Sequence, residues 1–186
     1  MYLIIIEGTD NIGKDTVINQ LIEKFDTATL IHCSGPKSKV FQSKEQDNKF
    51  IQYAENIVNR YYDNTDVIIM NRSHIGEYVY GQIYRQRSEA QIRSMLDKVN
   101  SILTSRQDLT IKYIQLLSSS IELRKKYDDN KSLSKMNDEL MKLENNLFLD
   151  VFDYIDLDKK LFYINDEDGF LPKEVIFKDI VDFLNT

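Results

Sequence analysis

The chain has 186 residues, of which 42% are hydrophobic and 11% aromatic, so it can bury one full core but would be crowded as two domains. Its formal net charge of −6 disfavours nucleic acid as a partner, while a local basic pocket for a small phosphorylated ligand stays compatible with it. The opening run MYLIIIEGTD is too short to span a membrane and lacks the basic leader of a signal peptide. Cys33 is the only cysteine, which fits a reducing, cytoplasmic location without internal disulfides.

Apolar runs and helical periodicity alternate along the first half of the chain. Residues 2–6 form a β-branched and aromatic run, which predicts a strand buried on both faces. Apolar residues then recur at helical spacing from Val17 to Phe25, and residues 29–33 predict a second strand. A polar loop leads into a helix that ends near Tyr62, and residues 66–72 predict a third buried strand.

The second half continues this alternation. Its predicted elements are a helix over 89–106, a strand over 109–118, a charged helix over 119–127, a long helix over 133–155, a strand over 160–165 and a last helix beginning at Pro172. Strands that alternate with helices predict an α/β fold with a parallel sheet covered on both faces. No linker, low-complexity run or repeat divides residues 1–186, so we expect a single domain.

The segment IIIEGTDNIGKDT, residues 4–16, carries the strongest chemical signal. Gly8, Gly13 and Lys14 satisfy the G-x-x-x-x-G-K pattern of a phosphate-binding loop, and they lie between a predicted strand and a predicted helix as that function requires. Glycines let the backbone wrap closely around phosphates, so that N–H groups and the positive end of the helix point at the anion. The residues expected to hold the phosphates are Gly8, Asn11, Ile12, Gly13, Lys14, Asp15 and Thr16.

Asp15 departs from the usual pattern, in which Ser or Thr follows the lysine and its hydroxyl ligates Mg²⁺. A carboxylate at this position can repel phosphate, or it can bind the metal directly or through water. We favour the second interpretation, because both glycines, Lys14 and Thr16 keep their register. Asp15 and Thr16 are therefore the predicted metal ligands. A tight strand-to-helix turn with a surface lysine is the purely structural alternative.

The motif EGTDNIGKDT resembles the E-G-x-D-x-x-G-K-x-T loop of the nucleoside monophosphate kinases of the thymidylate kinase type and of their deoxynucleoside kinase relatives. Its GKDT variant is similar to that of some bacteriophage deoxynucleotide kinases. The resemblance implies a P-loop three-layer αβα sandwich with a five-stranded parallel sheet and a helical lid. It also implies that the protein uses ATP and Mg²⁺ as cofactors and that Asp10 contacts the sugar of the acceptor.

A second stretch, MNRSHIGEYVYGQIYR at residues 70–85, resembles the Asp-Arg motif that follows the third strand of this family, together with the acceptor-site helix behind it. The resemblance implies that Arg72 holds the phosphate of the acceptor and that the loop around Pro36 lies near its sugar and phosphate. Asn71 stands where the family usually has Asp. An amide can hold a metal-bound water but cannot act as a base, so that role does not carry over unchanged.

A third stretch, ELRKKYDDNKSL, resembles the family's lid, which we place at approximately residues 119–135. Arginines of such a lid close over the transferred phosphoryl group, which makes Arg124 the candidate here. Lys125 and Lys126 are either further lid cations or a solvated helix face.

Several other side chains near these motifs have two interpretations. Tyr80 and Tyr84 can stack on the acceptor base or belong to the core. Glu77 can orient Arg72 or the acceptor, although the sequence favours an ordinary charge on a helix surface. His74 is assigned no catalytic role, because phosphoryl transfer depends on positioning and charge neutralisation more than on a strong base.

Together these residues predict an ATP-dependent kinase whose small-molecule nucleotide substrate is a deoxynucleoside monophosphate, with dTMP as the expected acceptor. Lys14, Arg72 and Arg124 are its predicted catalytic residues, and the resemblance implies a homodimer. One alternative is a deoxynucleoside or modified-base kinase of the same fold, although HCSGPKS after the second strand lacks the carboxylate base of a nucleoside kinase. The other is a non-catalytic ATP-binding regulatory protein, which Asp15 and Asn71 would suit.

Overall fold

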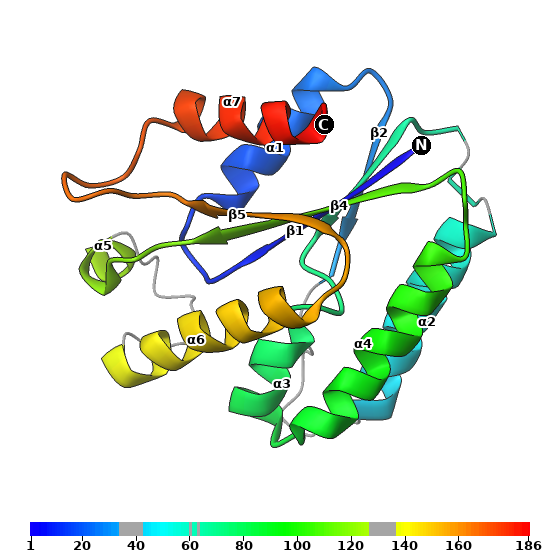
Figure 1. Cartoon of the computed structure of the whole chain (residues 1–186), viewed down its shortest axis with the longest axis horizontal. Helices are drawn as coiled ribbons and strands as arrows, with labels where there is room; N and C mark the ends of the chain where they lie inside the picture. The colour runs from blue at the N-terminus through cyan, green and yellow to red at the C-terminus, as the bar shows by residue number, and fades with distance from the viewer. Residues whose placement is uncertain (34–42, 60, 63, 127–136) are drawn as a thin grey trace.

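The computed structural model describes residues 1–33, 43–59, 61–62, 64–126 and 137–186, which form an α/β fold around one sheet. Its parallel strands run in the order β2-β3-β1-β4-β5 (Figure 1). The strands are β1 (Tyr2–Gly8), β2 (Ala28–His32), β3 (Val67–Asn71), β4 (Thr110–Leu117) and β5 (Asp158–Tyr163). The predicted five-stranded parallel sheet is therefore confirmed.

Seven helices occur in the described part of the chain. They are α1 (Lys14–Lys24), α2 (Ser43–Val58), α3 (Glu77–Arg85), α4 (Glu89–Thr104), α5 (Ile121–Lys126), α6 (Asp138–Tyr154) and α7 (Lys173–Leu184). Within those described ranges, none of them is both long and apolar enough to cross a bilayer.

Several element boundaries differ from the prediction by a few residues, and two of these differences have a visible cause. Strand β1 continues past residue 6, because Glu7 and Gly8 still pair with β4. Helix α2 ends at Val58 and not near Tyr62. Beyond its end, the N–H of Tyr61 bonds to the carbonyl of Asn56, five residues back, and no longer follows the four-residue spacing of an α-helix.

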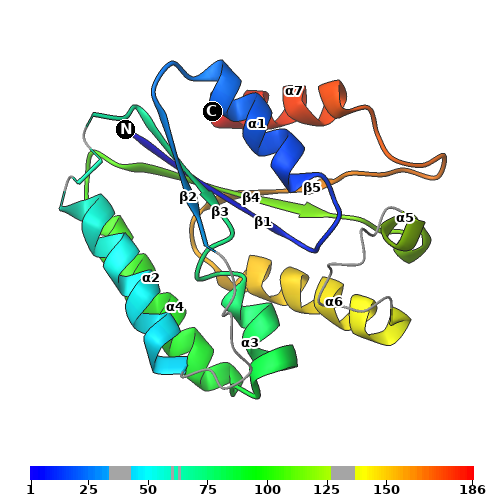
Figure 2. The same cartoon turned by 180° about the vertical axis from the view of Figure 1, so that it is seen from behind.

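Helices cover both faces of the sheet, as Figures 1 and 2 show: α1 and α7 lie on one face, and α2, α3, α4 and α6 lie on the other. The side chains of β1 alternate between two hydrophobic clusters. Leu3 and Ile5 belong to the cluster beneath α2, α3, α4 and α6, whereas Ile4 and Ile6 belong to the cluster beneath α1 and α7. Burial on both faces explains the continuous apolar run in the sequence and confirms the three-layer arrangement.

The carboxyl ends of the central strands meet at one edge of the sheet. The register pairs Ile6 of β1 with Asn71 of β3, and Gly8 of β1 with Leu116 of β4. After β1 the chain passes to α1 on one face, and after β3 it passes to α3 on the other (Figure 1). Ligands of α/β proteins bind where connections diverge in this way, so we expect a ligand site beside the segments that follow β1 and β3.

Candidate functional site

The loop between β1 and α1 has the backbone of an anion cradle. The angle φ is positive at Gly8 (143°), Asn11 (60°) and Gly13 (81°). A Cβ atom at Gly8 would lie 2.1 Å from the carbonyl oxygen of Leu116, so only glycine lets the loop leave β1 this close to β4. Gly13 is the N-cap of α1 and has no side chain to cap the first amides of the helix. The loop and the positive end of α1 thus offer the kind of amide donors that bind phosphate.

Lys14 begins α1, and its side chain folds back over the loop. Its Nζ donates to the carbonyl oxygen of Gly8 at 3.0 Å and also to the carbonyl oxygen of Thr9. Burial, assisted by the nearby positive charge of Arg72, lowers the pKa of Lys14 from 10.5 to about 8. A bound phosphate would favour the charged ammonium and reverse this shift.

The lowered pKa of Lys14 predicts that nucleotide binding is accompanied by proton uptake. Near pH 8 about half of the Lys14 side chains are neutral before binding, and a phosphate beside the amine raises its pKa, so roughly half a proton per site is taken up. Near pH 6.5 the amine is already charged, and the uptake through Lys14 falls toward zero. Isothermal titration calorimetry of ATP binding, in buffers that differ in ionisation enthalpy, measures this uptake.

The control for this titration is Lys14→Arg, which keeps the positive charge but does not titrate near pH 8. That variant should bind ATP without the pH-dependent uptake. Equal uptake in the two proteins at pH 8 would assign the proton to another group.

Asp15 and Thr16, the predicted metal ligands, are exposed on the first turn of α1. Asn71 at the end of β3 donates from Nδ2 to Oδ1 of Asp15 at 2.9 Å, which joins the first turn of α1 to β3. The Oδ1 atom of Asn71 is buried and has no hydrogen-bond partner among the residues that the structure describes. Carboxylate, hydroxyl and amide oxygens are the ligands that Mg²⁺ prefers, so the residues present fit this metal.

Asp10 and Arg72, the predicted acceptor ligands, form an ion pair. Asp10 comes from the phosphate loop and Arg72 follows β3, so the fold brings together two residues that are far apart in the sequence. Arg72 has a positive φ of 63°, and its guanidinium lies 5.4 Å from the centre of the Tyr80 ring. The Arg72 side chain is 27% exposed, which leaves part of the guanidinium open to a ligand.

Glu7 holds the turn that follows β3, a role that the sequence did not reveal. Its Oε1 accepts hydrogen bonds from the N–H of Ser73 at 2.5 Å, the hydroxyl of Ser73 at 2.8 Å and the N–H of Gly76 at 3.0 Å. Burial raises the pKa of the Glu7 carboxyl, and the Ser73 hydrogen bond and the charge of Arg72 oppose that rise. A Cβ atom at Gly76 would lie 2.8 Å from Oε2 of Glu7, so the turn closes directly over the carboxylate and sets the place of Arg72.

Tyr80 and Tyr84 stack on each other, with ring centres 6.1 Å apart and planes 22° apart. Tyr80 is buried, and its ring also packs edge-on against Phe148 of α6. The hydroxyl of Tyr84 donates to Glu144 at 2.9 Å. Both tyrosines therefore have core contacts, and stacking on an acceptor base stays a prediction.

Arg124, the predicted lid arginine, is buried and only 1% exposed. Its Nη2 donates to Oε2 of Glu144 at 2.8 Å, and its Nη1 donates to the carbonyl of Met141 and the side-chain oxygen of Asn145, each at 3.2 Å. Glu144 also accepts from Tyr84, so this ion pair is linked to a residue that is predicted to bind the acceptor. A part for Arg124 in closing over the phosphoryl group stays a prediction.

The rest of the predicted lid can be followed only in part. Residues 127–135 and Pro36 lie outside the described residues. Lys125 forms an ion pair with Asp138 at the start of α6, and its side chain is 34% exposed. This placement matches the interpretation of Lys125 as part of a solvated helix face.

Glu77 is buried, so its interpretation as a helix-surface charge is wrong. It is 3% exposed and accepts from Arg85 at 2.8 Å and from Arg87 at 3.2 Å. Arg87 in turn pairs with Asp47 of α2 at 2.8 Å. The guanidinium groups of Arg85 and Arg87 compensate the charge of the buried Glu77 carboxylate.

His74 has the character of a structural residue. It is 1% exposed, and its Nε2 lies 2.8 Å from the side-chain oxygen of Asn100. Burial lowers the pKa of His74 to about 4, so the ring is neutral at physiological pH.

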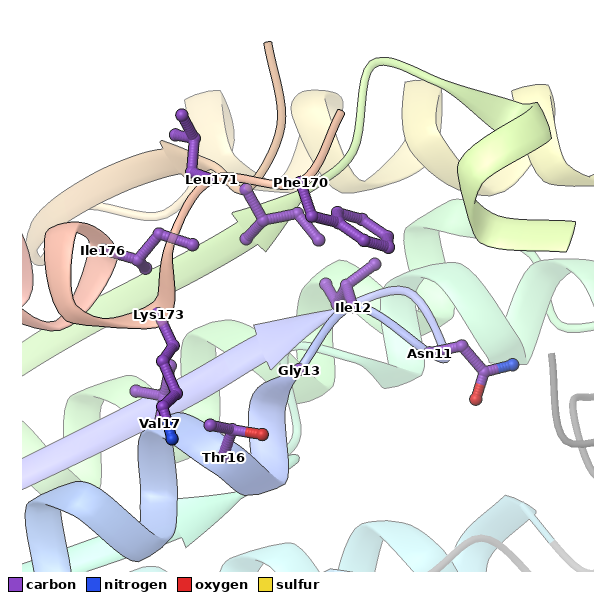
Figure 3. Close-up of a pocket in the computed structure, with 10 residues that line it drawn as sticks. Asn11, Ile12, Gly13, Thr16, Val17, Phe170, Leu171, Lys173 and Ile176 are labelled. Atoms are coloured by element: carbon purple, nitrogen blue, oxygen red, sulfur yellow. The ribbon is translucent and has the colours of Figure 1, made fainter. Parts of the chain in front are cut away.

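In the described part of the chain, two pockets lie beside the ends of β1 and β3. The larger, of about 250 Å³, separates the phosphate loop from the segment between β5 and α7 (Figure 3). It is lined by Asn11, Ile12, Gly13, Thr16, Val17, Ile164, Phe170, Leu171, Lys173 and Ile176. In Figure 3 the ring of Phe170 faces Ile12, whereas the side chain of Asn11 points away from the other lining side chains.

The smaller pocket, of about 70 Å³, lies beside Arg72, a predicted acceptor ligand. Its lining residues are Cys33, Gln46, Phe50, Arg72, Ser73, Gly76, Glu77, Tyr80 and Arg85. The first pocket is mostly apolar and touches the phosphate loop, whereas the second combines apolar and aromatic side chains with charged ones. The candidate site thus combines the loop between β1 and α1 with two chemically different pockets.

No family model and no curated protein sequence matches the chain. Solved structures match almost its whole length. YorR protein from Bacillus subtilis, in complex with phosphorylated GDP, is 19% identical with a TM-score of 0.65, over 98% of this chain and 95% of that one. Thymidylate kinase from Ehrlichia chaffeensis is 14% identical with a TM-score of 0.62, over 98% of each chain.

A deoxyadenosine kinase from M. mycoides, with the products dCMP and dCDP bound, is 16% identical with a TM-score of 0.57, over 98% of each chain. Identities this low establish similarity of fold. The chain therefore has the fold of structures that include nucleotide and deoxynucleoside kinases of the P-loop type.

Proposed function

We propose that this protein is an ATP-dependent kinase of a deoxynucleoside monophosphate, with dTMP as the first acceptor to test. The observation that best supports the proposal is that two cations, Lys14 and Arg72, lie close together. Arg72 is ion-paired to the phosphate loop through Asp10, and its charge contributes to the lowered pKa of Lys14. Transfer between two phosphates needs a cation for each of them at one place, and Lys14 and Arg72 meet that need.

On the donor side, the phosphates of ATP would lie in the loop over residues 8–16, with Lys14 on the β- and γ-phosphates. The apolar pocket between Ile12 and Phe170 has room for the face of a nucleobase. Asp15 and Thr16 would hold Mg²⁺, which supplies neutralisation of the phosphate charge when it is bound.

On the acceptor side, the guanidinium of Arg72 would grip the monophosphate, for which its paired N–H donors are well shaped. Asp10 would then release part of its ion pair and turn to the sugar, with Tyr80 on the base side. In the transfer step the bond from the γ-phosphorus to the bridging oxygen of ADP breaks, and a bond from that phosphorus to an acceptor phosphate oxygen forms. Lys14 and Arg72 offset the negative charge in this step.

A deoxynucleoside acceptor is the second candidate. The fold match to a deoxyadenosine kinase favours it, as does Oε2 of Glu7, which is buried with no hydrogen-bond partner among the described residues. The other oxygen, Oε1, accepts three hydrogen bonds from the turn after β3, which favours a structural role for the Glu7 carboxylate. A carboxylate with a structural role is not the base of a nucleoside kinase, so this favours the monophosphate as acceptor.

A coupled ADP-release assay tests the proposal, with ATP, Mg²⁺ and a panel of deoxynucleoside monophosphates and the matching nucleosides. We expect turnover with a monophosphate, on the order of 1–100 per second. Turnover with nucleosides alone would select the second candidate. No turnover with any acceptor, while ATP still raises the melting temperature, would contradict both and identify an ATP-binding protein without transferase activity.

A further inference from the structure

Asp15 and Asn71 form one hydrogen-bonded unit at the point where the phosphate loop meets β3. Asn71 is 4% exposed, and its Nδ2 lies 2.9 Å from Oδ1 of Asp15. A carboxylate can only accept hydrogen bonds, so the amide must present its N–H₂ group to Asp15 and turn its oxygen away. That oxygen is the buried atom without a partner in the described part of the chain. The orientation of Asn71 is therefore set by Asp15.

In this chain the carboxylate and the neutral group stand at the reverse of their usual positions. In P-loop enzymes a hydroxyl follows the loop lysine, and a carboxylate on a neighbouring strand supplies the negative charge beside the metal. Here the carboxylate follows the loop lysine, on the first turn of α1, and the neutral group is on the strand. The pair carries a single negative charge in either arrangement, but in this chain that charge lies at position 15.

The aspartate at position 15 and the asparagine at position 71 are each explained by the presence of the other. An aspartate at position 71 would place a second carboxylate within hydrogen-bond distance of Asp15 in a partly buried place, where like charges repel strongly. A serine at position 15 beside Asn71 would leave the two positions without a negative charge. An amide donor at position 71 is the group that holds the Asp15 carboxylate in place without adding charge.

We propose that Asn71 is a positioning residue that fixes Asp15 as the anionic ligand of the metal in the metal–nucleotide complex. The hydrogen bond occupies Oδ1 of Asp15 and leaves its other oxygen, on an exposed side chain, for the cation. This inference rests on the proposed nucleotide-binding function, but its test reads metal affinity and not turnover. The competing explanation is that Asp15 only stabilises the positive end of α1 and that Asn71 only satisfies it.

The experiment measures Mn²⁺ affinity by electron paramagnetic resonance in the complex with a non-hydrolysable ATP analogue. Asp15→Ser and Asn71→Ala should each weaken Mn²⁺ binding, by roughly 10–100-fold. The double variant Asp15→Ser/Asn71→Asp returns the charge to the strand and should recover the wild-type affinity to within about threefold. Glu23→Ser, which removes an exposed acid from the same helix, is the matched control and should leave the affinity unchanged.

Three results would overturn the inference. The first is an unchanged Mn²⁺ affinity in Asp15→Ser, and the second is no recovery in the double variant. The third is an Asn71→Ala protein that binds Mn²⁺ like the wild type. Because Asn71 is buried, circular dichroism and thermal melting check that each variant is folded. If Asn71→Ala does not fold, Asp15→Ser still tests the inference, because the Asp15 side chain is exposed.

The outcomes also separate this inference from the proposed function. Wild-type kinase activity together with an unaltered metal affinity in Asp15→Ser would overturn the inference alone. A wild-type protein that binds no Mn²⁺–nucleotide complex would overturn the proposed function and the inference with it.

Discussion

Replacing Lys14 with Ala should lower kcat with the accepted monophosphate by about 10²–10³-fold, the usual effect of removing one preorganised donor from a charged transition state. The melting temperature of the variant should equal or exceed that of the wild type. The lowered pKa of Lys14 means that the folded protein disfavours its charge, so the native state is penalised by burying this ammonium. Loss of activity without loss of stability is the combination expected of a functional residue.

The matched control for Lys14 is Lys24→Ala, which removes an exposed lysine from the last turn of the same helix. It should change neither kcat nor the melting temperature appreciably. Steady-state kinetics and thermal melting of both variants make the comparison. A Lys14→Ala protein with wild-type kcat would exclude Lys14 from phosphoryl transfer, and with it the proposed donor site.

Replacing Arg124 with Met should destabilise the protein by about 3–5 kcal/mol, because it leaves the Glu144 carboxylate buried without its partner. The side chains of Arg124 and Glu144 are 1% and 2% exposed, and they are 2.8 Å apart. The change also removes the donor to Met141 and Asn145. Urea denaturation measures the free energy of unfolding.

Two further variants sharpen the Arg124 experiment. Arg124→Met combined with Glu144→Gln removes the unpaired charge while keeping an acceptor for Tyr84, and it should recover much of the lost stability. Lys125→Met breaks the exposed pair with Asp138 and should cost no more than about 1 kcal/mol. A loss below about 1 kcal/mol in Arg124→Met would show that the arginine is not held by Glu144 in solution.

The buried pair also bears on the proposed lid. If Arg124 is to reach a transferred phosphoryl group, it must leave Glu144, and that carboxylate must find another donor. Tyr84 already donates to Glu144, so it can keep part of that interaction. The free energy needed to break the Arg124–Glu144 pair would therefore have to come from nucleotide binding when the lid closes.

The sequence by itself determined the features that depend on local pattern. Alternating strands and helices, a parallel sheet covered on both faces and a glycine-containing loop between the first strand and the first helix were all predicted, because burial periodicity and glycine conformation are properties of neighbouring residues. The register of the parallel strands then placed the ends of β1 and β3 together, and Asp10 and Arg72 form an ion pair there. Their assignment to the acceptor stays a prediction.

Only the tertiary structure decided the environment of the charged side chains. Asn71 bonds to Asp15, Glu7 holds the turn before α3, Glu77 is buried between two arginines, and Arg124 is paired with Glu144. Most of these contacts join different elements, whereas the partners of Glu77 lie at the end of its own helix and just beyond it. The packing of the elements decides which charges lose water. The sequence lists the charges, but the free energy of a buried charge depends on the partner that the fold brings to it.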